Sequence, residues 1–287
     1  MVRSSTIQLL RFHFSFFLMP VFWFGLACSK SICLHNALPV FLILHLLVFP
    51  ASNGYNSYMD KDSTSIGGVK NPKQPTKQLY YFSSVMDVAA LIFSFFISPL
   101  FFIGVLLYIL ASRAYSSRRI RIKKYPLGGL LTVMIFQGAV VFFLSIHGGS
   151  CQKELSFSFS AITGISFLIA SFYPLTQIYQ HKEDRDDGVK TISILLGYRG
   201  TFIFSGICFL VSMMFLGNYI ISNEKMETFL LMQLFFLPVI VFFFWWFLKV
   251  WKDEAAANFK NTMRMNIIGS IGSNAAFIFY LITKHFE

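Results

Sequence analysis

Long apolar segments alternate with short charged or turn-rich segments along the whole chain. Each apolar segment holds about 20 residues, the number that a helix needs to cross the roughly 30 Å hydrocarbon layer of a membrane. The pattern predicts an all-α, polytopic membrane protein that forms a single domain over residues 1–287. The expected helices are 7–28, 34–54, 80–97, 99–114, 126–147, 157–180, 200–221, 229–250 and 264–283.

Two of these segments need a further argument. The apolar stretch from Leu79 to Ala114 is too long for one span, and Ser98-Pro99 is the expected break because proline lacks the amide that a helix interior uses. The stretch from Ile7 is expected to be the first membrane helix and not a cleavable signal peptide, since it is long, contains Pro20 and lacks a small-x-small cleavage site. The sequence therefore predicts nine membrane helices.

Composition and charge agree with this organisation. Hydrophobic residues make up 55% of the chain and charged residues only 13%, against roughly 25% in a soluble domain. With the N-terminus in the cytoplasm, all but four of the 24 Lys and Arg residues fall in cytoplasmic segments, as the positive-inside rule requires. An eight-helix arrangement would place the basic segments 61–77 and 113–124 on opposite faces. Basic loops against anionic lipid account for the net charge of +11 without a nucleic-acid partner.

The carboxylates gather in two clusters that this topology places on the cytoplasmic face. Asp60 and Asp62 follow the second predicted helix, in a loop at about 53–78, and the second cluster follows the sixth helix, in a loop at about 180–199. That cluster consists of Glu183, Asp184, Asp186 and Asp187. Asn56 precedes Asp60 by four residues, as Gln180 precedes Asp184, so each amide shares a helical face with an acid. Each cluster continues into Gly-Val-Lys, at 68–70 and at 188–190, which indicates a short internal correspondence between two halves.

These residue types suit the binding of a diphosphate at a membrane surface. Carboxylate and amide oxygens are the hard ligands that Mg²⁺ prefers, and Mg²⁺ commonly uses a few of them together with substrate phosphates. Lysine and arginine neutralise the remaining phosphate charge. Asn53, Asn56 and Tyr58 stand where the chain is still apolar, and polar groups there are costly without a partner. A charged run such as KEDRDD is also compatible with a plain solvated loop.

At these positions the chain resembles the UbiA superfamily of intramembrane prenyltransferases, over nearly its whole length. That family has nine helices and two Asp-rich motifs, in the cytoplasmic loops after helices two and six. The family motif NDxxDxxxD is similar to NSYMDKDST at 56–64, and the motif DxxxD with a following Gly and Thr is similar to QHKEDRDDGVKT at 180–191. Tyr115-Ser116 with Arg121-Ile122-Lys123 is similar to the family's basic segment after helix four, and Lys70-Asn71-Pro72 to an element after the first motif.

Three positions depart from the family pattern. Ser57, Thr64 and Gln180 stand where the family motifs have aspartate. Asp62, Asp186 and Asp187 lie close enough in sequence to take over as ligands. The departures bear on activity more than on fold.

The resemblance implies Mg²⁺-dependent transfer of an isoprenyl group from a prenyl diphosphate to an aromatic or other lipophilic acceptor within the membrane. It implies Asp60 and Asp184 as catalytic residues. The implied metal ligands are Asn56, Asp60, Asp62, Asp184 and Asp187; the diphosphate-binding residues are Lys70, Arg121, Lys123 and Lys190; the substrate-pocket residues are Tyr58, Tyr115, Tyr173 and Gln180. The expected location is the inner (plasma) membrane, with the site facing the cytoplasm and membrane lipids around the bundle.

Other functions remain open at this point. The same scaffold could cyclise a prenyl diphosphate without a second substrate, or the missing aspartates could leave a non-catalytic isoprenoid-lipid binder. A secondary transporter is disfavoured because its coupling sites are expected near the bilayer midplane, whereas these acids lie at one rim. The tyrosines could instead be interfacial anchors. The four cysteines are scattered, without metal-type spacing, and are expected to be thiols packed in or near helices.

Overall fold

The computed structural model describes residues 2–286, and within this range it consists of helices and connecting segments without a β-strand. The helices are α1 (Ser4–Leu10), α2 (Met19–Cys28), α3 (Leu34–Leu42), α4 (Phe49–Asp60), α5 (Lys77–Ile97), α6 (Pro99–Ser116), α7 (Pro126–Val133), α8 (Val141–Gly149), α9 (Phe159–Gln177), α10 (His181–Asp186), α11 (Ile192–Asn223), α12 (Met226–Lys252) and α13 (Phe259–Phe286). Short 3₁₀ segments are η1 (Phe12–Phe17), η3 (Ile122–Lys124), η5 (Ile178–Gln180) and η6 (Glu254–Ala256).

Several of these elements join into longer spans. Two π-helical segments, η2 (Ile43–Val48) and η4 (Met134–Val140), connect α3 to α4 and α7 to α8. Between residues 2 and 286, eight helices are long and apolar enough to cross a membrane. A ninth span is formed if Ser4–Phe17 and Met19–Cys28, which meet at 41°, count as one. The prediction of an all-α membrane bundle with nine spans is confirmed on this count.

The break between the third and fourth spans lies at Ser98-Pro99, as predicted. α5 ends at Ile97 and α6 begins at Pro99, with Ser98 in an extended conformation between them. The Ser98 hydroxyl oxygen accepts a hydrogen bond from the Phe101 amide at 3.0 Å. A serine cap followed by proline at the first helical position therefore starts α6, because proline's missing amide is one that this position leaves unpaired anyway.

Other predicted boundaries were wrong. The second span continues to Asp60, beyond the predicted end at 54, and the sixth continues as a helix to Asp186, beyond 180. Both extensions are polar, so hydropathy alone marked them as loops, but backbone hydrogen bonding continues until a left-handed residue ends it. Lys61 (φ 56°) and Gly188 (φ 67°) supply those conformations. Asn56, Asp60 and Asp184 consequently lie on helices and not in loops.

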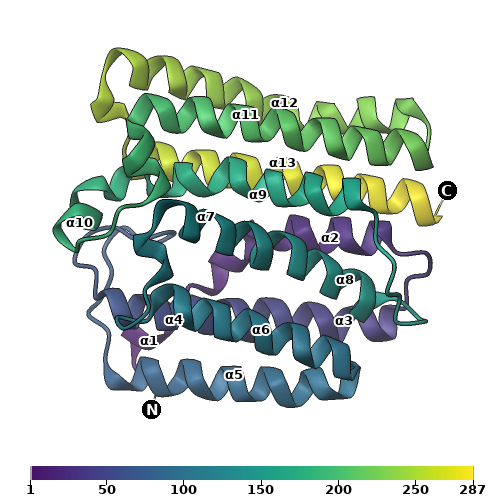
Figure 1. The fold of residues 1–287 in the computed structure, drawn as a ribbon, viewed down its shortest axis with the longest axis horizontal. Helices are drawn as coiled ribbons and strands as arrows, with labels where there is room; N and C mark the ends of the chain where they lie inside the picture. The colour runs from purple at the N-terminus through teal and green to yellow at the C-terminus, as the bar shows by residue number, and fades with distance from the viewer. Residues whose placement is uncertain (1, 287) are drawn as a thin grey trace.

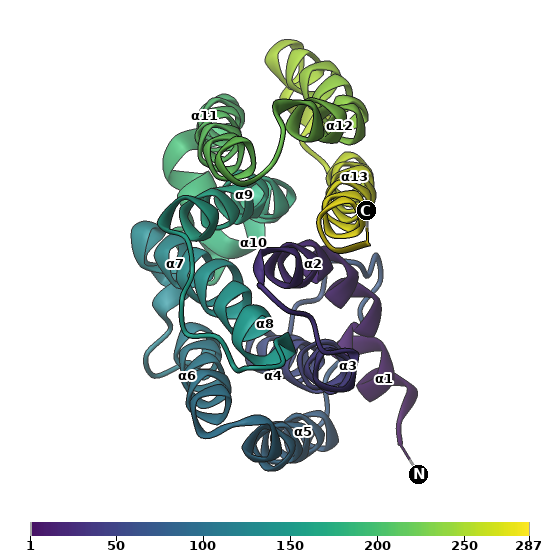
Figure 2. The ribbon, with the colours of Figure 1, turned by 90° about the vertical axis from the view of Figure 1, so that its right-hand side faces the viewer.

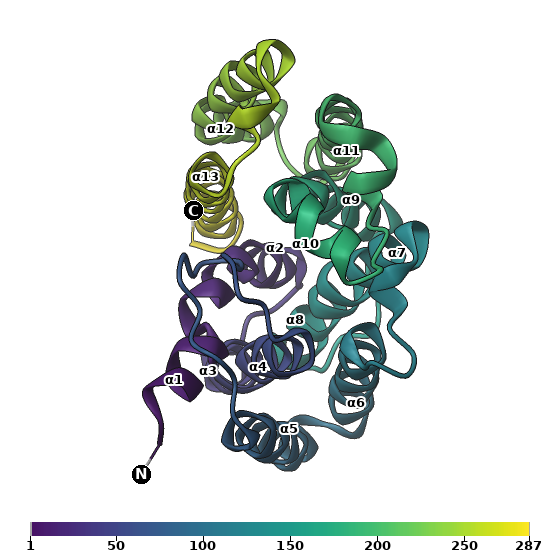
Figure 3. The same cartoon turned by 90° about the vertical axis from the view of Figure 1, so that its left-hand side faces the viewer.

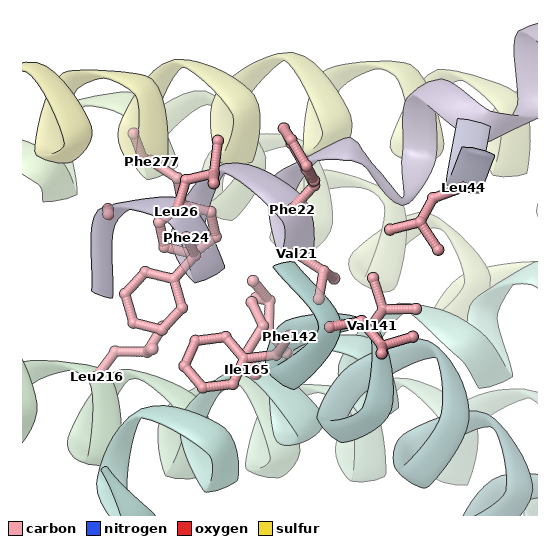
Figure 4. Packing of buried hydrophobic residues seen from close by; sticks show 14 of the residues in the cluster. Val21, Phe22, Phe24, Leu26, Leu44, Val141, Phe142, Ile165, Leu216 and Phe277 are labelled. Atoms are coloured by element: carbon pink, nitrogen blue, oxygen red, sulfur yellow. The ribbon is translucent and has the colours of Figure 1, made fainter. Parts of the chain in front are cut away.

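The helices lie side by side along the long axis of the molecule (Figure 1). End-on views (Figures 2 and 3) show α2 between α13 and α8, with α5 and α12 at opposite extremes of the bundle. α2 carries the centre of the core: Phe24 is fully buried, and its ring lies 4.8 Å from that of Phe277 on α13 and 5.5 Å from that of Phe142 on α8 (Figure 4). Large apolar side chains such as Phe96 on α5 are exposed, as expected of helices that face lipid.

Candidate active site

A cavity of about 250 Å³ opens between the helices near the end of the bundle that carries α10. Its lining changes character along the helices. Asn56 of α4, Ser116 of α6 and Gln180 of η5 lie at that end, whereas Phe49, Tyr108 and Leu168 lie farther along the same spans. The remaining aromatic lining is Phe14, Phe17, Tyr115, Phe136, Phe172, Tyr173 and Tyr179. The cavity is therefore polar toward the α10 end and largely aromatic farther in, with Gln137 and Ser273 as polar side chains among the aromatic ones, which suits a ligand with a charged head and an apolar tail.

The first acidic cluster occupies the last turns of α4. The Asn56 Nδ2 donates to the Asp60 carboxylate at 2.9 Å and to the Ser116 hydroxyl at 3.1 Å. Asp60 also forms a close ion pair with Lys123, and its Oδ1 lies 3.9 Å from Arg121. Only 6% of the Asp60 side chain is exposed. A buried carboxylate is thus held by an amide and balanced by two cations from the segment that follows α6.

The second acidic cluster is joined to the first by direct contacts. The Glu183 carboxylate accepts a hydrogen bond from the Thr64 amide at 3.0 Å, and the Gln180 side-chain amide donates to the Ser65 carbonyl at 3.4 Å. Asp184 is close enough for the charges of Asp60 and Asp62 to act on it. The two clusters, about 120 residues apart in the sequence, therefore lie next to each other beside the polar end of the cavity; among their residues Asn56 and Gln180 line the cavity, whereas the acids do not.

Three basic side chains lie between the clusters. Arg118 forms an ion pair of 2.7 Å with Asp187, and Arg121 contacts the same carboxylate more closely while also reaching toward Asp60. The third basic side chain, Lys123, forms an ion pair with Asp60. The structure thus brings together Asn56, Asp60, Asp187, Arg121 and Lys123 among the predicted site residues.

The charge environment differs between two of the acids. Burial raises the pKa of Asp62 to about 6, and the negative charge of Asp60 acts in the same direction. Burial also raises the pKa of Asp187, but hydrogen bonds from Arg118 and Arg121 outweigh it, so that this pKa is below its usual value. Within residues 2–286, no cation forms an ion pair with Asp62, although the charges of Lys123 and Arg11 act on it from farther away, and a bound metal ion would relieve its unfavourable charge.

Sequence reasoning missed Arg11, which lines the cavity. This residue takes a left-handed conformation (φ 48°) between α1 and η1, and its side chain is buried. Its guanidinium donates to the Asn53 carbonyl at 3.3 Å, the Asn56 side-chain oxygen at 3.5 Å and the Gly67 carbonyl at 3.4 Å, while its Nε has no hydrogen-bond partner. The signal that could have found it is an arginine inside a predicted membrane helix, a costly position without a role.

The predicted pocket residues divide into two groups. Tyr115 and Tyr173 line the cavity, with their hydroxyls 2.7 Å apart, and Gln180 lines it as well. Tyr58 instead packs against Tyr80, with ring centroids 5.3 Å apart, and is not among the described residues that line the cavity. Lys70 and Lys190 are exposed and also lie outside the lining.

The distances between the acids limit how many of them can bind the same metal ion. Between residues 2 and 286, no group of three or more His, Cys, Asp and Glu side chains is close enough to hold a metal ion alone. The available ligands are carboxylate and amide oxygens from two facing elements, with one Asp60 oxygen lacking a hydrogen-bond partner. This donor set fits Mg²⁺, which is usually bound through one or two carboxylates plus substrate phosphates.

Comparison with known proteins identifies the fold. A UbiA homologue from Archaeoglobus fulgidus, solved with GPP and Mg²⁺, has a TM-score of 0.71 at 17% identity, covering 98% of this chain and 99% of the homologue. A UbiA homologue from Aeropyrum pernix K1 gives 0.72 at 16% identity, with 93% and 98% covered. No curated protein sequence matches the chain. The family model described as the UbiA prenyltransferase family matches residues 17–268, and the chain therefore belongs to that family.

Proposed function

We propose that this protein transfers an isoprenyl group from a prenyl diphosphate to a lipophilic acceptor, with Mg²⁺ bound between the two acidic clusters. The observation that carries the proposal is the pairing of these clusters, with cations between them, beside the end of the cavity that Asn56 and Gln180 line. Membership of the UbiA prenyltransferase family supports it, as do the Archaeoglobus fulgidus homologue structures with DMAPP or GPP and Mg²⁺. The acceptor is an aromatic or other lipophilic molecule, because it has to reach an apolar cavity from the membrane.

The ligands of Mg²⁺ in this proposal are Asn56, Asp60, Asp62, Asp184 and Asp187, with Asp60 and Asp184 essential. Bound Mg²⁺ would act as a Lewis acid on the leaving diphosphate. The neutral Gln180 amide occupies a position that is acidic in the family motif, and Asp62 supplies carboxylate charge nearby. Ser57 is buried outside the cavity lining, so it does not compete for a ligand.

The basic residues change partners when substrate binds. Without a diphosphate, Arg121 and Lys123 are paired with Asp60 and Asp187. A diphosphate entering the polar end attracts these cations, because its charge is larger and its oxygens accept several hydrogen bonds. Asp60 and Asp187, which this exchange releases from their ion pairs, are then available to bind Mg²⁺. Lys70 and Lys190, which are exposed, attract the negatively charged diphosphate from solution.

The aromatic lining protects the reacting carbon. Breaking the allylic C–O bond leaves a carbocation, and a nucleophilic atom of the acceptor attacks it. The faces of Tyr115 and Tyr173 stabilise positive charge and exclude water that would quench it. Their hydrogen bond to each other fixes both rings at the border between the polar and apolar parts of the cavity.

The test of this function is diphosphate release from geranyl, farnesyl and geranylgeranyl diphosphates by purified protein. Release is measured with Mg²⁺ or with EDTA, and with or without a panel of aromatic acceptors. We expect release that requires both Mg²⁺ and an acceptor. Release without an acceptor would establish a cyclase instead. Binding of the donors without any release would establish a non-catalytic isoprenoid-lipid binder.

Mg²⁺ binding is expected to weaken as the pH falls through about 6. Burial raises the pKa of Asp62 to about 6, so this carboxyl is ionised at pH 7 and increasingly protonated below pH 6, when it loses its value as a ligand. The Mg²⁺ concentration for half-maximal activity should therefore rise between pH 7 and pH 5. Asp62→Asn should raise that concentration at pH 7 and flatten its change with pH. An unchanged pH dependence in this variant would remove Asp62 from the ligand set.

A further inference from the structure

Two of the four cysteines meet at the end of the bundle opposite the acidic clusters. Cys33 immediately precedes α3, and the span that begins there ends at Asp60. Cys151 follows α8, and the span that ends there begins at Pro126, close to Lys123. Both cysteines therefore lie a full membrane span away from the site, at the side of Figure 1 where α3 begins and α8 ends. Cys33 and Cys151 lie next to helix ends, as expected from the sequence, but the spacing of the cysteines gave no sign that these two would meet.

Backbone pairing sets the register of the two cysteines. Ile32 and Ser150 form an isolated antiparallel bridge. The Cys33 amide donates to the Gly149 carbonyl at 3.0 Å, and the Cys151 amide donates to the Ser31 carbonyl at 3.2 Å. Because side chains alternate along extended segments, Cys33 and Cys151 point to the same face of this pairing. The two thiols are close enough for the charge of one to act on the other.

Further contacts hold the two segments in this register. The Glu154 carboxylate accepts hydrogen bonds from the Lys30 amide at 2.8 Å and the Ser31 amide at 3.3 Å. The Asn36 side-chain amide donates to the Ser150 carbonyl at 3.1 Å. The thiols are thus brought together by the fold itself, and closing a bond between them does not require the two segments to find each other.

The pair is accessible, whereas the other cysteines are less so. Cys151 is exposed and Cys33 half-buried, while Cys208 is buried. Cys28 is half-buried at the end of α2. The proposed orientation, with the acidic clusters in the cytoplasm, places Cys33 and Cys151 on the outer face. Outer faces of membranes are the compartments in which disulfides form and persist.

We propose that Cys33 and Cys151 form a disulfide bond that joins the segment between α2 and α3 to the segment between α8 and α9. The two thiols lose two protons and two electrons, and a disulfide oxidant, either a thiol–disulfide oxidoreductase or oxidised glutathione, accepts them and becomes two thiols. The bond closes a covalent loop that contains α3 to α8. It constrains the unfolded chain over a long loop, which is the situation in which a disulfide stabilises most.

The test uses a Cys28→Ser/Cys208→Ser variant, which keeps only the proposed pair. The purified protein is incubated with oxidised glutathione, denatured in SDS and treated with a polyethylene glycol maleimide, before or after reduction. We expect no maleimide addition before reduction and two additions after it, with the protein monomeric on a non-reducing gel. Two additions before reduction, or a disulfide-linked dimer, would overturn the proposal.

Cys33→Ser in the same background supplies the matched control, because Cys151 is then alone and should be labelled once in either condition. The thermal unfolding midpoint gives an independent readout. It should fall on reduction of the protein that keeps the pair and stay constant in the Cys33→Ser variant. Prenyl transfer should be equal in the two redox states, since the pair lies a membrane span away from the acids. Equal midpoints would overturn the stabilising role of the bond.

Discussion

Replacing Asp60 with Asn is expected to lower the rate of diphosphate release by about a hundred- to a thousand-fold, the loss typical when one charge-stabilising group is removed from a catalytic site. The substitution keeps the shape of the side chain and its hydrogen bond from Asn56, and removes the charge that balances Lys123 and Arg121. Without that charge, Mg²⁺ loses a ligand and the two cations lose the partner that positions them. The measurement is steady-state release of diphosphate over a range of Mg²⁺ concentrations.

The control for this substitution is Asp253→Asn. Asp253 is an exposed carboxylate that caps η6 by accepting from the Ala255 amide at 2.9 Å, and asparagine can make the same bond. It should leave the rate unchanged. The Asp60→Asn protein should elute as a monodisperse species in detergent, so that lost activity is separated from misfolding. Wild-type activity in Asp60→Asn would show that the first cluster does not take part in the reaction.

Replacing Arg11 with Gln is expected to lower kcat/KM for the prenyl diphosphate by about a hundred-fold, the effect of losing a charge-assisted contact of about 3 kcal/mol. Arg11 brings the only positive charge among the described residues that line the cavity, and its Nε is free to donate to a ligand. Glutamine retains hydrogen-bonding capacity toward the Asn53 and Gly67 carbonyls, so the local fold should persist. The measurement is kcat and KM for each donor.

Two comparisons make the role of Arg11 testable. Arg11→Lys keeps the charge but not the fork of donors, and it should recover part of the activity lost in Arg11→Gln. Arg3→Gln removes an exposed arginine near the same end of the chain and should have no effect. Equal kcat/KM in Arg11→Gln and the wild type would show that Arg11 only ties the α1–η1 junction to α4.

Asp87 and Arg113 show that a buried acid in this family need not belong to the site. Asp87 lies in the middle of α5 and forms an ion pair with Arg113 of α6. The Arg113 guanidinium also lies 3.9 Å from the centre of the Tyr55 ring on α4. Such a pair keeps both charges compensated within the membrane and ties α4, α5 and α6 together below the acidic clusters.

The predictable part of the site follows from spacing on one helix. Asn56 and Asp60 share a face because four residues make about one turn of a helix and α4 continues to Asp60. The same spacing gave no information on Tyr58, which lies on another face and packs against Tyr80. Spacing also gave no information on Lys70 and Lys190, because both lie in connecting segments, where sequence spacing does not fix the direction of a side chain.

The sequence by itself determined the membrane bundle, the break at Ser98-Pro99 and the grouping of the acids into two clusters after the second and sixth spans, because apolar length, proline and residue spacing act within one segment. Only the tertiary structure decided which segments meet. Arg11 reaches Asn56, Arg121 joins Asp60 to Asp187, and Cys33 meets Cys151, in each case across many residues of chain. Those meetings depend on how all the helices pack against one another, and no local pattern of hydropathy or charge encodes that packing.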